Sequence, residues 1–261
     1  MNFKNVLFKV ENHVAYVSVN NPPANALNSD MITGVKDCFE YLSKDEDVKV
    51  VVLTGEGKFF VAGADIKEFT KGFDNTEIGE SMAEAGQELC DKIEQMEKPV
   101  IAAINGACLG GGLELAMGCH LRIAANEAKI GLPELTLGLI PGFGGTQRLS
   151  RLTNKAKALE LILTSEFVNG EEAANIGLVN LSVPLDELTA VTKKLAESIA
   201  LKKSLPSINA AVQAVNQGFD MSQSDGLALE AKLFGQMFGT DDMKEGVNAF
   251  LEKRSAVFHD K

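Results

Sequence analysis

The sequence has few of the residues that metal sites and hydrolytic triads require. Its three histidines, His13, His120 and His259, are dispersed along the chain, and neither an HExxH motif nor a Cys/His metal spacing occurs. It also lacks GxSxG, the turn that carries the nucleophile of many hydrolases. These absences argue against a zinc enzyme and against a triad hydrolase, and we expect no metal site.

Cysteine is also sparse, and no CxxC pair is present. We interpret the four cysteines as reduced core residues of a protein from a cytoplasm-like compartment: Cys38, Cys90, Cys108 and Cys119. Cys108 and His120 could in principle form a thiolate pair, but a cysteine inside an apolar run is far more often a packing residue.

Long hydrophobic runs and targeting segments are missing as well. The most apolar stretch, residues 100–119, contains Asn105, Glu114 and five glycines, whereas a membrane-spanning helix needs about 20 mainly apolar residues. The opening residues, MNFKNVLFKVEN, resemble neither a signal peptide nor a transit peptide. We therefore expect a soluble, cytoplasmic protein without a membrane partner.

The charge balance is acidic. Asp and Glu number 36 against 25 Lys and Arg, which gives a net charge of -11. Nucleic-acid binding needs clustered basic side chains, so this balance argues against a nucleic-acid partner. A small anionic ligand could still be held by backbone N–H groups and one or two lysines.

The chain is long enough, at 261 residues with 45% hydrophobic content, to bury a large core. Residues 13–20 and 48–54 have the β-branched, apolar pattern of strands. Between them, residues 30–43 have helical spacing, with Ser29 or Asp30 as the expected N-cap. This order predicts a β-helix-β unit.

The same alternation continues and then stops. Residues 79–96 predict a helix, and residues 100–105 and 121–125 predict two further strands, so the architecture is expected to be α/β. From about Pro184 the pattern indicates helices only, at residues 185–201, 206–217, 223–238 and 241–252. A C-terminal helical module is therefore predicted, with a boundary between about residues 184 and 205.

Two glutamates stand alone in apolar, glycine-rich surroundings. Glu114 is the only ionisable acid or base in residues 100–119, and Glu134 is the only charged residue in residues 130–147. Burial of a lone carboxylate favours its neutral form, which makes such a residue a candidate proton donor. The alternative, that each glutamate caps a helix or reaches water, stays open on spacing alone.

Two small-residue segments could present backbone N–H groups to a ligand. Gly110, Gly111 and Gly112 precede a helical run, and residues 59–66 follow a predicted strand. Either segment could supply donors to an oxyanion or a phosphate. Taken alone, tight helix packing and an ordinary loop explain the two segments better.

Combined in order along the chain, these segments resemble the crotonase (enoyl-CoA hydratase/isomerase) superfamily: FVAGADIKEF, KPVIAAINGACLGGGLELAMGCHLRIA and IGLPELTLGLIPGFGGTQRL. The resemblance runs from NNPPANALN near the start to FLEKRSAVF near the end. It implies a spiral of repeated ββα units over residues 1–195. It also implies a helical trimerisation region over residues 196–261, in a homo-trimer or homo-hexamer.

The resemblance also implies a catalytic site. The backbone N–H groups of Ala64 and Gly111 would form an oxyanion hole for a thioester carbonyl. Glu114 would act chiefly as the base on a water molecule, and Glu134 would supply a proton to Cα. Gly142 would lie in the loop that shapes this site.

Coenzyme A would be part of the substrate, and no further cofactor is implied. Lys67, and Lys253 from a neighbouring subunit, would lie near its phosphates, although both are equally explained as solvated surface lysines. The full implied binding set is Ala24, Ala26, Leu27, Ala62, Gly63, Ala64, Asp65, Ile66, Lys67, Gly110, Gly111 and Lys253.

The implied reaction is hydration of a trans-2-enoyl-CoA to a 3-hydroxyacyl-CoA, in fatty-acid β-oxidation or related acyl-CoA metabolism. A Δ3,Δ2-enoyl-CoA isomerase, a CoA-ester hydrolase or a carbon-carbon bond lyase remains an alternative, as does a non-catalytic RNA-binding or scaffold member. The chain has no GxGxxG fingerprint. A separate 3-hydroxyacyl-CoA dehydrogenase would therefore oxidise the product. Acyl length would depend on the loop at residues 69–80.

Overall fold

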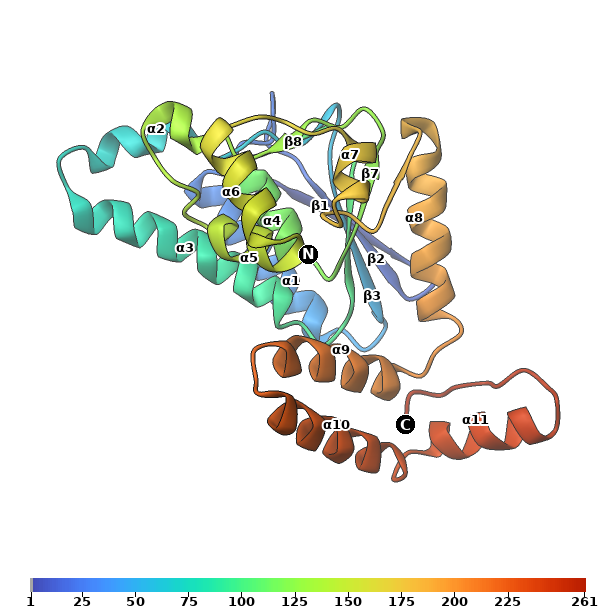
Figure 1. Ribbon diagram of the computed structural model, residues 1–261. Helices are drawn as coiled ribbons and strands as arrows, with labels where there is room; N and C mark the ends of the chain where they lie inside the picture. The colour runs from blue at the N-terminus through green and yellow to red at the C-terminus, as the bar shows by residue number, and fades with distance from the viewer. Residues whose placement is uncertain (1) are drawn as a thin grey trace.

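Two sheets built almost entirely from parallel strands form the body of the molecule, in a computed structural model that describes residues 2–261 (Figure 1). The larger sheet has the strand order β1-β2-β3-β5-β7-β9, and only the β1–β2 pair is antiparallel. Its strands are β1 (Val6–Glu11), β2 (Val14–Val19), β3 (Val50–Gly55), β5 (Val100–Ile104), β7 (Leu121–Ala125) and β9 (Leu181–Val183). The predicted α/β class is confirmed.

The central strands are apolar because helices cover both faces of the sheet. All five residues of β5 are buried, as expected for a strand inside a parallel sheet. Leu53 of β3 pairs with Val17 on one side and with Ala102 on the other, which fixes the register. The predicted strands at residues 13–20, 48–54, 100–105 and 121–125 are therefore confirmed, whereas β1 was not predicted.

The smaller sheet consists of three short strands, β4 (Phe59–Val61), β6 (Ala107–Leu109) and β8 (Ile130–Gly131). Each follows a strand of the larger sheet after a tight turn, in the order β3–β4, β5–β6 and β7–β8. A helix then leads to the next turn of the chain. The repeat of a strand in each sheet followed by a helix is the expected spiral, and it exists without a repeated sequence.

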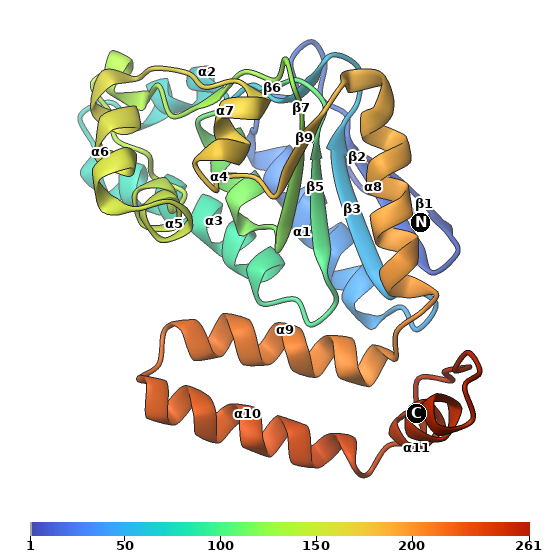
Figure 2. The ribbon, with the colours of Figure 1, turned by 45° about the vertical axis from the view of Figure 1, so that its right-hand side comes forward.

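Helices enclose the larger sheet from both sides (Figure 2). On one side lie α1 (Ser29–Lys44), α3 (Thr76–Glu94) and α4 (Gly111–Gly118), and on the other lies α8 (Leu185–Ala200). The helix predicted at residues 30–43 is α1, but its N-cap is not Ser29 or Asp30. The Asn28 side chain instead accepts a 2.9 Å hydrogen bond from the Met31 N–H, because Asn28 is the last residue with extended backbone.

Shorter helices connect these elements. They are α2 (Ile66–Phe69), η1 (Thr70–Gly72), η2 (Glu134–Leu137), α5 (Gly145–Leu152), α6 (Lys155–Thr164) and α7 (Gly170–Asn175). Within residues 2–261, no helix combines the length and the apolar character needed to cross a membrane.

The C-terminal helices lie below the sheets in Figures 1 and 2. After β9, the chain as described to residue 261 contains only α8, α9 (Leu205–Phe219), α10 (Gln223–Met237) and α11 (Asp241–Leu251). The predicted helical run is thereby confirmed. The boundary between residues 195 and 196 stays a prediction; α8, which packs on β3, β5 and β7, continues across it.

The four cysteines are free and buried, as predicted for core residues. Cys108 and His120 do not form a thiolate pair: the Cys108 thiol contacts the Gly112 carbonyl. The His120 Nδ1 atom accepts from the Val100 N–H at 2.9 Å. Burial lowers the pKa of His120 to about 4, so this ring is a neutral structural group.

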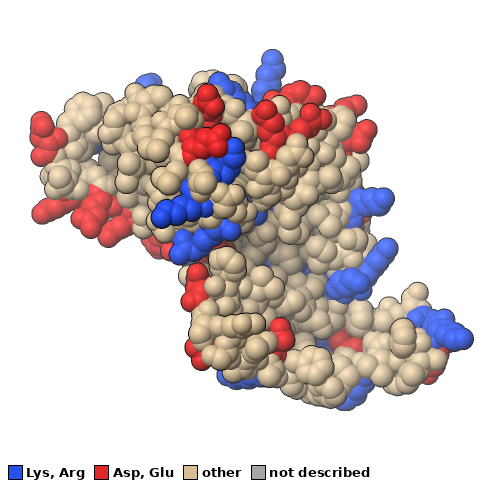
Figure 3. Space-filling model, viewed as in Figure 1, with Lys and Arg blue, Asp and Glu red and all other residues tan. Residues whose placement is uncertain are grey.

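Charged side chains are unevenly distributed over the face in Figure 3. Acidic side chains gather along the α3 edge and at the top of the molecule, and Lys and Arg form separate small groups. This face therefore presents no continuous basic stripe to a polyanion.

Candidate active site

Helix α4 carries Glu114 into the interior. All eight residues of this helix are buried, so its only charged side chain has no polar face to occupy, and Glu114 is 2% exposed. The helix begins after Gly110, whose φ of 52° lies in the left-handed region that favours glycine. The predicted isolation of this carboxylate is thus a property of the fold.

Two backbone N–H groups hold the Glu114 carboxylate. Its Oε1 atom accepts hydrogen bonds from Phe143 N at 2.8 Å and from Gly145 N at 2.7 Å. Burial, followed by the charge of Glu134, raises the pKa of Glu114 to about 7, although both hydrogen bonds and Arg148 oppose this rise. Near neutral pH the side chain is therefore poised to accept or donate a proton.

Glu134 is the first residue of η2, and its side chain faces the turn at Gly110 that precedes α4. A Cβ atom added to Gly110 would lie 2.9 Å from Glu134 Oε1. The other oxygen, Oε2, is buried and has no hydrogen-bond partner among residues 2–261. Burial raises the pKa of this carboxyl. An unpartnered carboxyl oxygen with a raised pKa is suited to meet a group of a bound ligand.

The N–H group of Ala64 points away from the nearest backbone segment. Leu27 donates to the Gly63 carbonyl and accepts from the Asp65 N–H, both at 2.8 Å. In such a parallel bridge the middle residue, Ala64, directs its own N–H to the opposite side. No acceptor for the Ala64 N–H occurs within the described chain.

Gly111 supplies a second free donor beside the first. It is the first residue of α4, where backbone N–H groups lack intrahelical acceptors, and its N–H also has no partner in residues 2–261. The segments are adjacent, since a Cβ added to Gly110 would lie 3.9 Å from the Gly63 Cα. The structure therefore brings together both predicted N–H donors and both predicted glutamates.

Asn25 fixes the turn between β3 and β4, the strand that precedes Ala64, and sequence reasoning missed it. Its side chain is 3% exposed and donates to the carbonyls of Glu56 and Phe59, each at 3.0 Å. Its φ of 55° is typical of asparagine in the left-handed region. The only available signal was its place in NNPPANALN.

Most of the other predicted binding residues lie in two segments, residues 24–27 and residues 62–66. The Ala24 carbonyl accepts from Ala62 N at 3.1 Å, and Leu27 is bonded to Gly63 and Asp65, so residues 24–27 lie beside residues 62–65. The Ala26 carbonyl accepts from the Asn21 side chain at 2.7 Å. Asp65 caps α2 by accepting from the Lys67 N–H, and Ile66 is the first residue of that helix.

The two predicted lysines lie at the surface, and their contacts with coenzyme A stay a prediction. Lys67 and Lys253 are exposed, and Lys253 follows α11, which lies below the sheets and far from α4 (Figure 1). Gly142 does lie at the site, next to Phe143, and its carbonyl accepts from the Gln87 side chain at 2.9 Å.

Phe143, Gly145 and Arg148 were not identified from the sequence, although the first two donate to Glu114. Their signal was the glycine cluster GFGG followed by the first basic residue after Glu134. The Phe143 ring packs on the backbone of Gly86 and Gly111, where added Cβ atoms would lie 2.1 and 3.2 Å from it. These contacts place the Glu114 donors against α3 and α4.

The fold and site define an enzyme class with paired carboxylates beside two free backbone donors, and sequence comparison identifies its family. The model of the enoyl-CoA hydratase/isomerase family matches residues 9–261. This protein therefore belongs to the enoyl-CoA hydratase/isomerase family, and the resemblance seen in the sequence is confirmed.

Named relatives cover 95% to 100% of the chain. A "Probable enoyl-CoA hydratase" of Bacillus subtilis (strain 168) is 48% identical and spans 95% of this chain and 96% of its own. A "Crotonyl-CoA hydratase" of Syntrophomonas wolfei is 45% identical over 100% of both chains. The crystal structure of an enoyl-CoA hydratase from Bacillus anthracis superposes with a TM-score of 0.93 at 35% identity, covering 99% of this chain and 100% of that one.

Proposed function

We propose that this protein is an enoyl-CoA hydratase, which adds water across the double bond of a trans-2-enoyl-CoA to give a 3-hydroxyacyl-CoA. One observation carries the proposal: the buried carboxylate of Glu114 and the half-buried carboxylate of Glu134 lie beside the free N–H groups of Ala64 and Gly111. The relatives named enoyl-CoA hydratase and crotonyl-CoA hydratase support the same reaction.

In the proposed mechanism, the thioester carbonyl accepts hydrogen bonds from Ala64 N and Gly111 N. Electron density then shifts from the double bond toward this oxygen, which makes Cβ electrophilic. Each donor of such a pair contributes about 2.7–4 kcal/mol to transition-state stabilisation. Gly63, with a φ of 126°, and Gly110 allow the two segments to approach closely.

The two glutamates complete the addition. Ionised Glu114 takes a proton from water as the water oxygen bonds to Cβ, and protonated Glu134 donates its proton to Cα. The product gains both hydrogens and the oxygen of one water molecule, and a proton transfer from Glu114 back to Glu134 restores the starting state. General acid-base catalysis of this kind contributes about 10² to 10⁴-fold.

Substrate recognition follows from the same surroundings. Residues 24–27 and 62–66, together with Gly110 and Gly111, would bind the coenzyme A portion through backbone groups. Lys67 would approach its phosphates, joined by Lys253 from a neighbouring subunit. The reaction adds water without oxidation, so coenzyme A as part of the substrate is the only cofactor proposed.

The proposal also covers the oligomeric state, the compartment and the pathway. The C-terminal helices expose large apolar side chains, such as Phe234 at 65% and Phe250 at 82%, which supports assembly as a homo-trimer or homo-hexamer. We place the enzyme in the cytoplasm, in fatty-acid β-oxidation or related metabolism. A separate 3-hydroxyacyl-CoA dehydrogenase would take its product.

The test is loss of the ultraviolet absorbance of the enoyl thioester when purified protein is mixed with crotonyl-CoA. Rapid loss by the natural sequence, abolished in Glu114→Gln and in Glu134→Gln, is the expected result. No loss with enoyl-CoA of any chain length would contradict hydration and direct the search to isomerase and hydrolase reactions. Filter binding to RNA at physiological salt tests the non-catalytic alternative.

A further inference from the structure

Arg148 lies directly behind the loop that holds Glu114. It belongs to α5, its side chain is 11% exposed, and its Nη1 atom donates to the Phe143 carbonyl at 3.1 Å. The guanidinium also covers Gly144, where an added Cβ would lie 2.2 Å from Nη1. The loop and this side chain are therefore packed as one unit.

Two carboxylates at the end of α3 fix the orientation of the guanidinium. Arg148 Nη2 lies 2.7 Å from Glu94 Oε2 and 2.5 Å from Asp91 Oδ1, and Nε donates to Glu94 Oε2 at 3.0 Å. Because the guanidinium is a planar fork, these bonds leave Nη1 directed at the Phe143 carbonyl.

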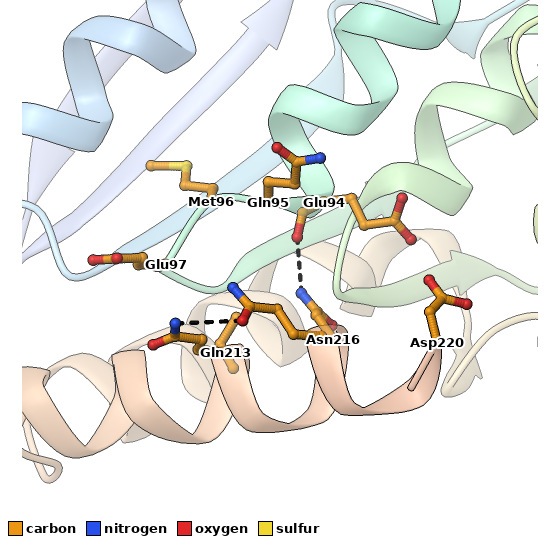
Figure 4. A pocket seen from close by; sticks show the side chains of 9 residues that line it. Glu94, Gln95, Met96, Glu97, Gln213, Asn216 and Asp220 are labelled. Atoms are coloured by element: carbon orange, nitrogen blue, oxygen red, sulfur yellow. Dashed lines mark hydrogen bonds between the residues drawn. The ribbon is translucent and has the colours of Figure 1, made fainter. Parts of the chain in front are cut away.

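Hydrogen bonds to the backbone carbonyl of Glu94 fix the position of this residue. Its carbonyl accepts from the Asn216 side chain of α9 at 2.8 Å, across the cavity in Figure 4, and it also lies 3.1 Å from His120 Nε2. The anchor of Arg148 is thus tied to α9 and to the turn between α4 and β7.

Phe143 connects this anchor to the base. Its carbonyl accepts from Arg148, while its N–H and that of Gly145 donate to Glu114 Oε1. We propose that Arg148 is a positioning residue for Glu114, which holds the 143–145 segment so that the base is oriented toward water. This inference rests on the proposed function and assigns Arg148 no contact with the substrate.

The charge of Arg148 provides a second, independent readout. Three titratable groups interact electrostatically with Glu114, namely Cys90 of α3, Glu134 of η2 and Arg148 of α5. Arg148 lowers the pKa of Glu114, so its removal raises that pKa. The loss of kcat/KM that accompanies removal of the last proton from the glutamate pair then moves to higher pH.

The experiment compares Arg148→Gln and Arg148→Lys, with Arg151→Gln as the matched control. Arg151 is on the same helix but is bound to Gln147 and lies 3.7 Å from Asp220, away from the loop. With crotonyl-CoA, Arg148→Gln is expected to lower kcat by about 10²-fold, as a misplaced catalytic group does, with KM nearly unchanged. Arg151→Gln should retain the activity of the natural sequence.

Arg148→Lys separates position from charge. A lysine keeps the positive charge but cannot reach the carbonyl and both carboxylates in a fixed fork. It should lower kcat by about tenfold and leave the high-pH limb of kcat/KM in place, whereas Arg148→Gln should move that limb upward. If Arg148→Gln does not fold, by circular dichroism and thermal melting, the lysine variant carries the test.

The outcomes are distinct. A folded variant at position 148 with unchanged kcat and pH profile, or one that raises only KM, would overturn the positioning role while leaving the hydratase intact. An inactive natural sequence would instead overturn the proposed function.

Discussion

The two halves of the site differ in how firmly they hold their carboxylate. Around α4, Glu114 is buried and its Oε1 is fixed by Phe143 N and Gly145 N. Around η2, Glu134 keeps a buried oxygen without a partner, and the chain continues into exposed apolar residues such as Ile140, at 72%. Under the proposed function, one carboxylate is oriented before substrate arrives and the other is left to meet it, and unequal surroundings of this kind separate acid from base.

The largest expected effect comes from removing the fixed carboxylate. Glu114→Gln should lower kcat toward crotonyl-CoA by about 10⁴-fold, because no other group on the described chain is held to accept the water proton, and Glu134→Gln by about 10³-fold. Stopped-flow absorbance measures both. Equal activity of either variant and the natural sequence would remove the corresponding role.

The same substitution should stabilise the fold at neutral and higher pH. The pKa of Glu114 in the folded state is raised to about 7 from 4.5. Ionisation of Glu114 therefore leaves the free energy of unfolding unchanged below about pH 4.5, and lowers it fully above about pH 7. The difference corresponds to about 3 kcal/mol. Glu114→Gln should therefore gain up to this amount over the natural sequence in urea unfolding at about pH 8, and much less at about pH 4.

Glu84→Gln, at an exposed position of α3, is the control for this stability measurement. It should change the free energy of unfolding little at either pH. A Glu114→Gln gain that did not depend on pH would refute burial of the charged form as its cause.

A smaller effect is expected from Gly110→Ala, which disturbs both η2 and the start of α4. The new Cβ would lie 2.9 Å from Glu134 Oε1 and would also strain a residue with a φ of 52°. We expect kcat to fall by about tenfold from displacement of the acid, with a loss of stability of about 1–3 kcal/mol. Gly235→Ala, where an added Cβ has nothing within 4 Å, should keep full activity, and full activity in both variants would contradict this account.

The mildest test is the pH profile of the unmodified enzyme. In the proposed mechanism the two carboxyls titrate as a pair, and the active form holds one proton between them. Because the pKa of Glu114 is about 7 in the presence of the charge of Glu134, kcat/KM should fall about tenfold per unit above that pH. A flat profile from pH 6 to 9, about one unit below and two above the expected pKa, would contradict the shared proton.

The long elements and the two carboxylates were predictable because each leaves a local pattern. Helix α1 has apolar residues at helical spacing, and Glu114 and Glu134 are single charges in apolar runs. Strands β4, β6 and β8 are too short, at three, three and two residues, to show a period. The spiral path of the chain, and no local pattern, determines which of these strands pair with each other.

Contacts made across the fold left no such pattern. The N–H groups that hold Glu114 come from residues 29 and 31 positions later, and backbone donors carry no side-chain signature. Arg148 reaches back 54 positions to Glu94. Asn28 replaced the predicted caps because capping depends on where the backbone leaves the extended region, which residue type alone does not fix.

The spiral separates the parts of the chain that must keep their length from those that are free to vary. Each turn gives one strand to each sheet, so the donors at Ala64 and Gly111 are held at the ends of fixed strands. Residues 70–76, from η1 to the first residue of α3, contribute no strand to either sheet. Under the proposed function, insertions or deletions there would reshape the space for the acyl chain without changing the register of either sheet, so substrate size and chemistry could diverge independently.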